Sequence, residues 1–168
     1  MVYLLGGLAS DSNKPMPIET REYVKENWRR IQKKIPNIKF NYNFWTSCEP
    51  KRSTYPACRA VICAKQQHPD FENLMIHGIQ KSYYLEAQNP SNEDVLIKIA
   101  KKLDLNTDKF KLDLQSSQVH EILLDEIKLA RSMDLYSMPS LALQINSTLK
   151  LIDIDYLDAN YIVKQIIP

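Results

Sequence analysis

The sequence predicts an α/β fold in which a long helical region separates one N-terminal strand from a C-terminal β-hairpin and a last helix. Apolar residues recur at helical spacing through most of residues 18–133, whereas short β-prone runs lie on either side of that region. Only 3 glycines among 168 residues argue against an all-β protein rich in tight turns. A hydrophobic content of 44% lets a chain of this length bury one substantial core, so we expect one domain with an insertion.

The first third of the chain contains one predicted strand and one predicted helix. Residues 2–5, with the sequence VYLL, form a short β-prone run that is closed by two glycines, and they predict a strand. Apolar residues at helical spacing over 18–35 predict a helix that ends before Pro36. Residues 36–52 have no sustained period but carry several aromatic side chains, so we expect an ordered connection lying on the core.

The middle of the chain predicts a series of amphipathic helices. The first is expected to begin at Ser53 or Thr54, either of which can cap it, and it carries a stripe of small residues suited to close helix packing. Four further helix starts are predicted from proline or from capping side chains: Pro69, Ser91, Thr107 and Ser117.

The last part of the chain predicts a β-hairpin and a helix. Residues 140–145 and 149–154 are two strand-like runs, and Asn146 with Ser147 supplies the turn between them. Asp155 is the expected cap of the final helix.

Charge and hydropathy limit the partners and the location that we expect. The net charge is +2, and the basic residues are spread along the whole length without a stripe, so no nucleic-acid partner is expected. No run approaches the roughly 20 apolar residues of a membrane span, and the first residues lack a basic leader with a long apolar run. The sequence therefore predicts a soluble cytoplasmic protein with no membrane partner.

Four stretches carry a resemblance to a known family: LLGGL at 4–8, FWTSCEPKRSTYPACRAV at 44–61, SYYLEAQNPS at 82–91 and DEIKLARSMDLYSMPSLAL at 125–143. With the element order, they resemble the FrnE-like branch of the DsbA family of thiol-disulfide oxidoreductases, a thioredoxin fold with a large helical insertion. The resemblance implies that residues 1–8 and 134–168 form a partial thioredoxin-like unit. It also implies that residues 9–133 form the inserted helical domain.

The family pattern also includes a segment that has no match in this chain. In the family, a strand and a helix that starts with a Cys-x-x-Cys motif precede the strand matching VYLL, and none of the cysteines here lies in such a motif. The resemblance therefore implies a truncated unit with no catalytic residue. A sheet without its middle strand has three remedies: preceding residues outside this sequence, strand exchange in a homodimer, or direct pairing of residues 2–5 with the hairpin.

Pro139 lies just before the first hairpin strand, where a proline cannot donate a ladder hydrogen bond. From the residues alone it is an ordinary trans proline before an edge strand. The resemblance instead implies a cis proline, with Met138 and Pro139 bordering the groove for a cysteine-containing protein or peptide substrate.

The three cysteines are Cys48, Cys58 and Cys63. Cys58 falls near the start of a predicted helix, where the helix end and Arg59 favour a reactive thiolate; a small packed side chain is the alternative. Cys58 and Cys63 lie about 7.5 Å apart along a helix axis, beyond the usual limit of about 7 Å for a disulfide. A bond between Cys48 and Cys58 stays open, although thiols are expected in the cytoplasm.

The remaining polar candidates favour structural roles. His68, His77 and His120 have no partner at coordinating spacing, so no metal site is expected, and no motif indicates a cofactor. Tyr83 and Tyr84 either line a groove or pack as half-buried side chains.

Three functions follow from the sequence. The first is a DsbA-like thiol-disulfide oxidoreductase or isomerase family protein that is inactive as this chain, because the catalytic dithiol is absent. The second is a non-catalytic module that binds a peptide or protein. The third is a glutathione-dependent transferase or isomerase of a related thioredoxin-fold class. Whether the chain is an enzyme is left open.

Overall fold

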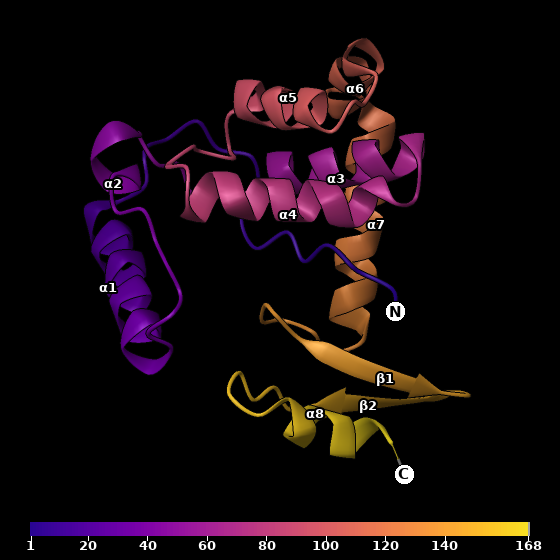
Figure 1. Ribbon diagram of the computed structural model, residues 1–168. Helices are drawn as coiled ribbons and strands as arrows, with labels where there is room; N and C mark the ends of the chain where they lie inside the picture. The colour runs from indigo at the N-terminus through magenta and orange to yellow at the C-terminus, as the bar shows by residue number, and fades with distance from the viewer. Residues whose placement is uncertain (168) are drawn as a thin grey trace. The chain divides into compact units, whose positions relative to one another are not determined.

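The computed structural model describes residues 1–167 and is mainly helical (Figure 1). The described elements follow in this order: α1 (Ile18–Lys34), α2 (Phe44–Ser47), α3 (Tyr55–Gln67), α4 (Phe71–Tyr84), α5 (Glu93–Lys102), α6 (Thr107–Leu114), α7 (Ser117–Ser132), β1 (Leu141–Ile145), β2 (Thr148–Ile152) and α8 (Ala159–Ile166). The chain divides into two compact units, and the division falls within α7. One unit comprises Gly7–Leu124, and the other comprises Met1–Gly6 with Asp125–Pro168.

Helix α3 is the centre of the helical unit. It packs against α4, α5 and α6, and Figure 1 shows α3 and α4 side by side. Its run Ala60–Ala64 is almost fully buried, as the predicted stripe of small residues requires for close helix packing. The other fully buried large side chains of this core come from the surrounding helices: Met75, Leu96, Phe110, Leu114, Val119 and Leu123.

A second cluster, which is aromatic, joins α1 and α2 to the end of α4. Trp28 is 3% exposed and stacks on Phe40 with ring centroids 4.9 Å apart, while Trp45 lies 5.0 Å from Trp28. Tyr83 packs edge-on against Phe44 at 4.7 Å. Residues 36–52 therefore lie on the core as predicted, and Tyr83 has a packing role.

The predicted cap at Ser53 or Thr54 is wrong. Helix α3 begins after Thr54, but no side chain caps it. The Thr54 hydroxyl instead accepts a bond from Ala9 N at 3.0 Å and donates to Ala9 O at 3.1 Å, while Ser53 Oγ accepts from Ser12 N at 3.3 Å. These oxygens fasten the segment after Gly7 to the start of α3, so they are not available to the helix end.

Other predicted helix starts are displaced by one to three residues. The side chains that cap are Asn106, which accepts from Lys109 N, and Asp158, which accepts from Asn160 N. Ser116 Oγ accepts from Val119 N at the start of α7. The predicted cappers do not act at those ends: Ser91, Thr107, Ser117 and Asp155. Helix α4 begins at Phe71, two residues after Pro69. A capping side chain must lie directly before the first helical residue, so a helix that begins one to three residues away from the predicted start uses a different capping residue.

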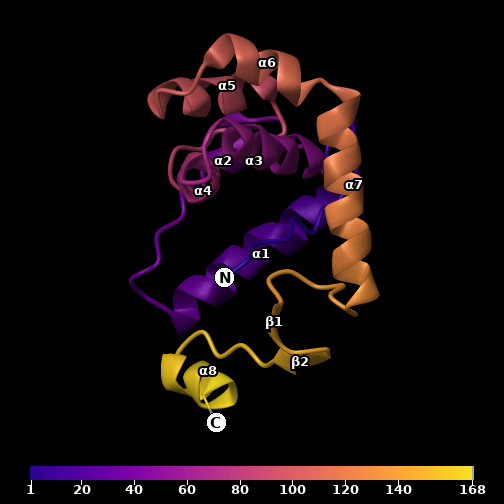
Figure 2. The same cartoon turned by 90° about the vertical axis from the view of Figure 1, so that its right-hand side faces the viewer.

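The second unit contains the hairpin, and its prediction is confirmed. Strands β1 and β2 pair antiparallel with Ile145 opposite Thr148, so Asn146 and Ser147 form a two-residue turn, and Asn146 has φ of 55°. Figure 2 shows α8 beside this hairpin, and Lys150 Nζ donates to Gln165 O at 2.8 Å. Ile152 is the strand residue that is buried, at 5% exposed.

The strand predicted for residues 2–5 is wrong. These residues have no regular secondary structure, and the hairpin strands pair only with each other among residues 1–167. Leu5 N donates instead to Glu126 Oε2 at 2.8 Å. Glu126 lies on α7, in the part of that helix that belongs to the same unit as Leu5. The Glu126 carboxylate therefore accepts the hydrogen bond from Leu5 N that a carbonyl of a neighbouring strand would otherwise accept.

Candidate functional site

The loop between α7 and β1 holds Met138 and Pro139. Helix α7 ends at Ser132, and two residues later Asp134 has a left-handed backbone with φ of 58°, while Leu135 N donates back to Ala130 O at 3.0 Å. This is a Schellman closure, which turns the chain sharply out of the helix. The Met138–Pro139 peptide bond is cis, and Ser140 Oγ donates to the Ser137 carbonyl across it.

Met138 lies against Gly6. A Cβ placed on Gly6 would lie 1.9 Å from Met138 Cε, 2.5 Å from Sδ and 2.8 Å from Cγ, so only glycine allows this approach. Met138 nevertheless keeps 37% of its surface exposed. The result is a soft thioether that rests on backbone on one side and faces solvent on the other. Sequence reasoning treated Gly6 only as the end of a strand; the LLGGL match was the signal that it belongs to the site.

The hairpin beside this loop has open backbone edges. Neither β1 nor β2 has a ladder partner other than the other strand within residues 1–167. Apolar side chains of the hairpin are also exposed: Ile145 by 57%, Leu149 by 37% and Leu151 by 53%. An open edge beside an exposed apolar residue can take an extended polypeptide, because the edge supplies main-chain hydrogen bonds and side-chain pockets supply selectivity.

The three cysteines all belong to the Gly7–Leu124 unit, whereas the Met138–Pro139 loop belongs to the other unit, and none of the cysteines is in a disulfide bond within residues 1–167. Cys63 is completely buried, and burial raises the pKa of its thiol to about 12. Cys48 is half-buried on the aromatic cluster and donates to Ala87 O at 2.9 Å. Both are packing residues.

Cys58 lies in the first turns of α3 and is half-buried. Its backbone N–H donates to Thr54 O at 3.1 Å, as in any helical turn. The sequence hypothesis of a reactive thiol at this position stays a prediction, as do the substrate-binding roles of Met138 and Pro139.

The histidines lie at helix ends or on the surface. His68 is the exposed C-terminal cap of α3, His77 Nδ1 lies 2.7 Å from Asn73 O, and His120 lies beside Tyr55. Across residues 1–167, no three or more His, Cys, Asp or Glu side chains gather as metal ligands would.

Comparison with known proteins defines the class. A family model described as Thioredoxin matches residues 8–158, and this chain belongs to that thioredoxin family. The solved structure of "a putative protein disulfide isomerase" from Nitrosomonas europaea matches with a TM-score of 0.78 and 19% identity, covering 94% of this chain and 76% of that one. The cytosolic disulfide reductase DsbM from Pseudomonas aeruginosa matches with a TM-score of 0.70 and 19% identity, covering 88% of this chain and 72% of its own. The predicted DsbA-type thioredoxin-like fold is thereby confirmed.

Curated relatives add a second kind of protein. The ClpXP adapter protein SpxH of Bacillus subtilis is 27% identical over 122 residues, which cover 72% of this chain and 40% of the relative. SpxH of Halalkalibacterium halodurans is 25% identical over 122 residues, covering 73% of this chain and 39% of the relative. The chain thus spans about two fifths of the length of these relatives. None of the helices described in residues 1–167 is both long and apolar enough to cross a bilayer.

Proposed function

We propose that this chain is a DsbA-like member of the thiol-disulfide oxidoreductase family that holds an extended segment of a protein partner at Met138 and Pro139. In this proposal its own cysteines do no dithiol chemistry. The observation that carries it is the half-exposed Met138, which rests on Gly6 beside a hairpin with open edges, in a sequence of 168 residues without a Cys-x-x-Cys pair.

The chemistry of these groups suits binding. A thioether is flexible and polarizable, so Met138 can adapt to different apolar or sulfur-containing side chains of a partner. The open edge of β1 begins two residues after Pro139, so main-chain donors and acceptors follow directly along the chain. Relatives described as ClpXP adapters are in keeping with a role that recruits protein rather than transforms it.

The domain assignment and the location belong to the same proposal. In this proposal residues 1–8 and 134–168 form the partial thioredoxin-like unit and residues 9–133 the inserted helical domain. The division of the chain into Met1–Gly6 with Asp125–Pro168 and Gly7–Leu124 supports this assignment, although it puts the second half of α7 with the hairpin. A cytoplasmic location is supported by the similarity to a reductase described as cytosolic.

The binding test uses a fluorescein-labelled extended peptide of ten residues that contains one cysteine between apolar residues. We expect Met138→Asp to weaken its binding, measured by anisotropy, by roughly tenfold or more, because a charge would replace an apolar contact. The matched control is Leu112→Asp, since Leu112 is also an exposed apolar residue but lies on α6 and is 75% exposed. Equal losses in the two variants would remove Met138 from the site.

The redox test asks whether the chain does chemistry. We expect no reduction of insulin with dithiothreitol present beyond the rate of the reagent alone, and no change of thiol content when the labelled peptide binds. Turnover at rates typical of disulfide reductases would favour an enzyme instead. Binding of glutathione would favour the transferase or isomerase alternative.

A homodimer is the finer form of the partner proposal. The open edges of the hairpin allow a second copy to complete the sheet. Sedimentation equilibrium measures the mass in solution, and a strict monomer at about 100 µM would exclude sheet completion between copies.

A further inference from the structure

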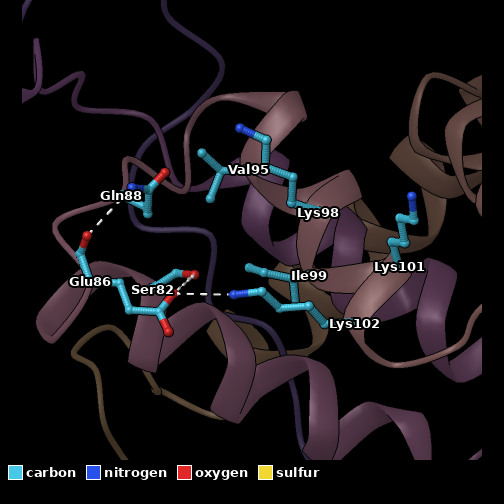
Figure 3. Close-up of a pocket in the computed structure, with 8 residues that line it drawn as sticks. All are labelled: Ser82, Glu86, Gln88, Val95, Lys98, Ile99, Lys101 and Lys102. Carbon is cyan, nitrogen blue, oxygen red and sulfur yellow. Dashed lines mark hydrogen bonds and ion pairs between the residues drawn. The ribbon is translucent and has the colours of Figure 1, made fainter.

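A groove runs between the end of α4, the turn over residues 85–88 and α5 (Figure 3). Its volume is about 570 Å³, within the range of about 300–1,000 Å³ that is usual for ligand sites. Val95 and Ile99 form an apolar floor and are 7% and 4% exposed. The two helices are close here, because a Cβ on Gly78 would lie 2.6 Å from Ile99 Cγ2. The floor is thus fixed by helix packing.

The rim of the groove is basic. Helix α5 contributes Lys98, Lys101 and Lys102, and Lys81 of α4 lies beside them. Lys81 and Lys102 each place Nζ 3.6 Å from a carboxylate oxygen of Glu86. Lys98 and Lys101 make no ion pair or side-chain hydrogen bond within residues 1–167. Two cationic groups are therefore left over after the internal carboxylate is paired.

One carboxylate of the chain itself, that of Glu86, already lies on the basic rim of the groove. Its half-buried carboxylate lies between the two lysines, and the hydroxyl of the buried Ser82 lies 3.4 Å from Glu86 Oε2. Figure 3 shows Lys102 reaching toward Glu86, whereas Lys98 and Lys101 point away from it. One side of the groove already holds a carboxylate of this chain, and the other side has lysines without one.

We propose that this groove binds an acidic segment of a protein partner, with carboxylates on Lys98 and Lys101 and an apolar side chain on Val95 and Ile99. Charge complementarity between basic rim and acidic segment steers the encounter and fixes the register. An apolar side chain between acidic residues matches the floor. A single-stranded nucleic acid fits less well, because the lining residues include no aromatic ring on which a base can stack and do include an acidic side chain.

Stabilisation of the helix end is another reason for lysines on α5, but it applies to only two of the three. Lys101 and Lys102 lie in the last turn of α5, where positive charge is favourable beside the helix C-terminus. Lys98 lies a turn earlier, so the helix end does not account for it. The whole groove lies in the Gly7–Leu124 unit, and its residues are separate from those of the Met138–Pro139 loop.

The test measures an acidic peptide on the full chain. The probe is a fluorescein-labelled octapeptide of Asp and Glu with two Leu, titrated by anisotropy in 0.1 M NaCl. We expect Lys98→Glu/Lys101→Glu to raise the Kd roughly five- to twenty-fold, since each exposed charge pair contributes modestly and reversal adds repulsion. The matched control is Lys33→Glu/Lys34→Glu, which makes the same charge change in the last turn of α1 and should alter the Kd less than about twofold. Circular dichroism checks that both variants fold.

Three results would overturn the proposal. They are equal loss of binding in both double variants, equal affinity for a peptide with Lys in place of the acids, or tighter binding of an eight-nucleotide single strand. The Met138→Asp variant distinguishes the groove proposal from the proposed binding of a partner at the Met138–Pro139 loop. It should bind the acidic octapeptide like the unaltered chain, and a loss there would place the acidic peptide at the Met138–Pro139 loop.

Discussion

The side chain of Met138 lies over the α-carbon of Gly6, so closely that a methyl group on Gly6 would lie 1.9 Å from Met138 Cε and 2.8 Å from Cγ. The contact at Cγ means that moving the tip of the methionine is not sufficient, and the whole side chain must change rotamer. Since Met138 is 37% exposed, solvent offers room for that change.

Gly6→Ala should therefore affect binding more than stability. We expect the free energy of unfolding to fall by about 1 kcal/mol or less, since the displaced side chain is partly exposed. We expect affinity for the cysteine-containing peptide to fall about as far as in Met138→Ala. In a Met138→Ala background the Gly6 substitution should have no further effect on binding, because the two groups no longer meet. Independent, additive losses would show that Gly6 acts by another route.

Gly78 and Ile99 give a test of the helix packing beneath the basic groove. Gly78→Ala gains about 1 kcal/mol of helix propensity, but its methyl group would lie 2.6 Å from Ile99 Cγ2, and overpacking costs about 1–3 kcal/mol. We expect a net loss of stability in urea unfolding. In an Ile99→Ala background the same substitution should stabilise, because the obstructing methyl is gone. The same sign in both backgrounds would contradict the close approach.

Arg59 and Asp11 form a bidentate ion pair that fastens the segment after Gly7 to α3. Arg59 donates from Nη1 to Asp11 Oδ2 at 2.7 Å and from Nη2 to Oδ1 at 3.0 Å. The arginine side chain is 11% exposed and the aspartate 48%. We expect Asp11→Asn to lower the free energy of unfolding by about 1–2 kcal/mol, between the values for buried and for surface pairs. Glu26→Gln, which breaks the exposed pair with Arg29, should lower the free energy of unfolding by clearly less than Asp11→Asn, because water and salt screen a pair in which both side chains are exposed. If Asp11→Asn and Glu26→Gln lowered the free energy of unfolding equally, burial of Arg59 would add nothing to the strength of its ion pair.

Local patterns predicted the elements that local forces determine. The helix over 18–35 and the hairpin turn at Asn146 and Ser147 follow from side-chain period and turn chemistry, and the structure has α1 at Ile18–Lys34 and a two-residue turn. The strand-like runs at 140–145 and 149–154 also predicted β1 and β2 to within a residue or two.

Contacts between distant residues were not predictable in this way. Thr54 has the sequence features of a cap, but its hydroxyl is engaged by Ala9, and nothing within a helical turn of Thr54 indicates that. The strand expected at 2–5 failed for a related reason, because strand formation depends on a partner and not on β propensity alone. The three lysines of α5 that line the basic groove lie at helical spacing, but its other wall, with Ser82 and Glu86, comes from α4 and the turn after it, and no helix pattern indicates that these segments meet.

Cys63 makes the stability of the helical unit depend on alkaline pH. Burial raises the pKa of its thiol from the ordinary value of 9.0 to about 12, and the charge of Asp113 acts in the same direction. Above about pH 9 the unfolded chain releases this proton while the folded chain keeps it, so stability should fall with rising pH. One such group contributes a slope of about 1.4 kcal/mol per pH unit until about pH 12. The pKa values of Tyr83 and Tyr84 are also raised by burial, which adds to the decline from about pH 10 upward.

The measurement is urea unfolding at intervals from pH 8 to pH 10, where the thiol dominates. Cys63→Ala should be less stable at pH 8, because a buried side chain is shortened, but its stability should fall less steeply between pH 9 and pH 10. Cys48→Ala is the matched control, and it should keep the slope of the unaltered chain because Cys63 is still present. Parallel declines in Cys63→Ala and the unaltered chain would mean that Cys63 does not hold its proton. Iodoacetamide gives an independent check at pH 8, where Cys63 should be modified only after urea unfolds the chain, since it is 0% exposed when folded.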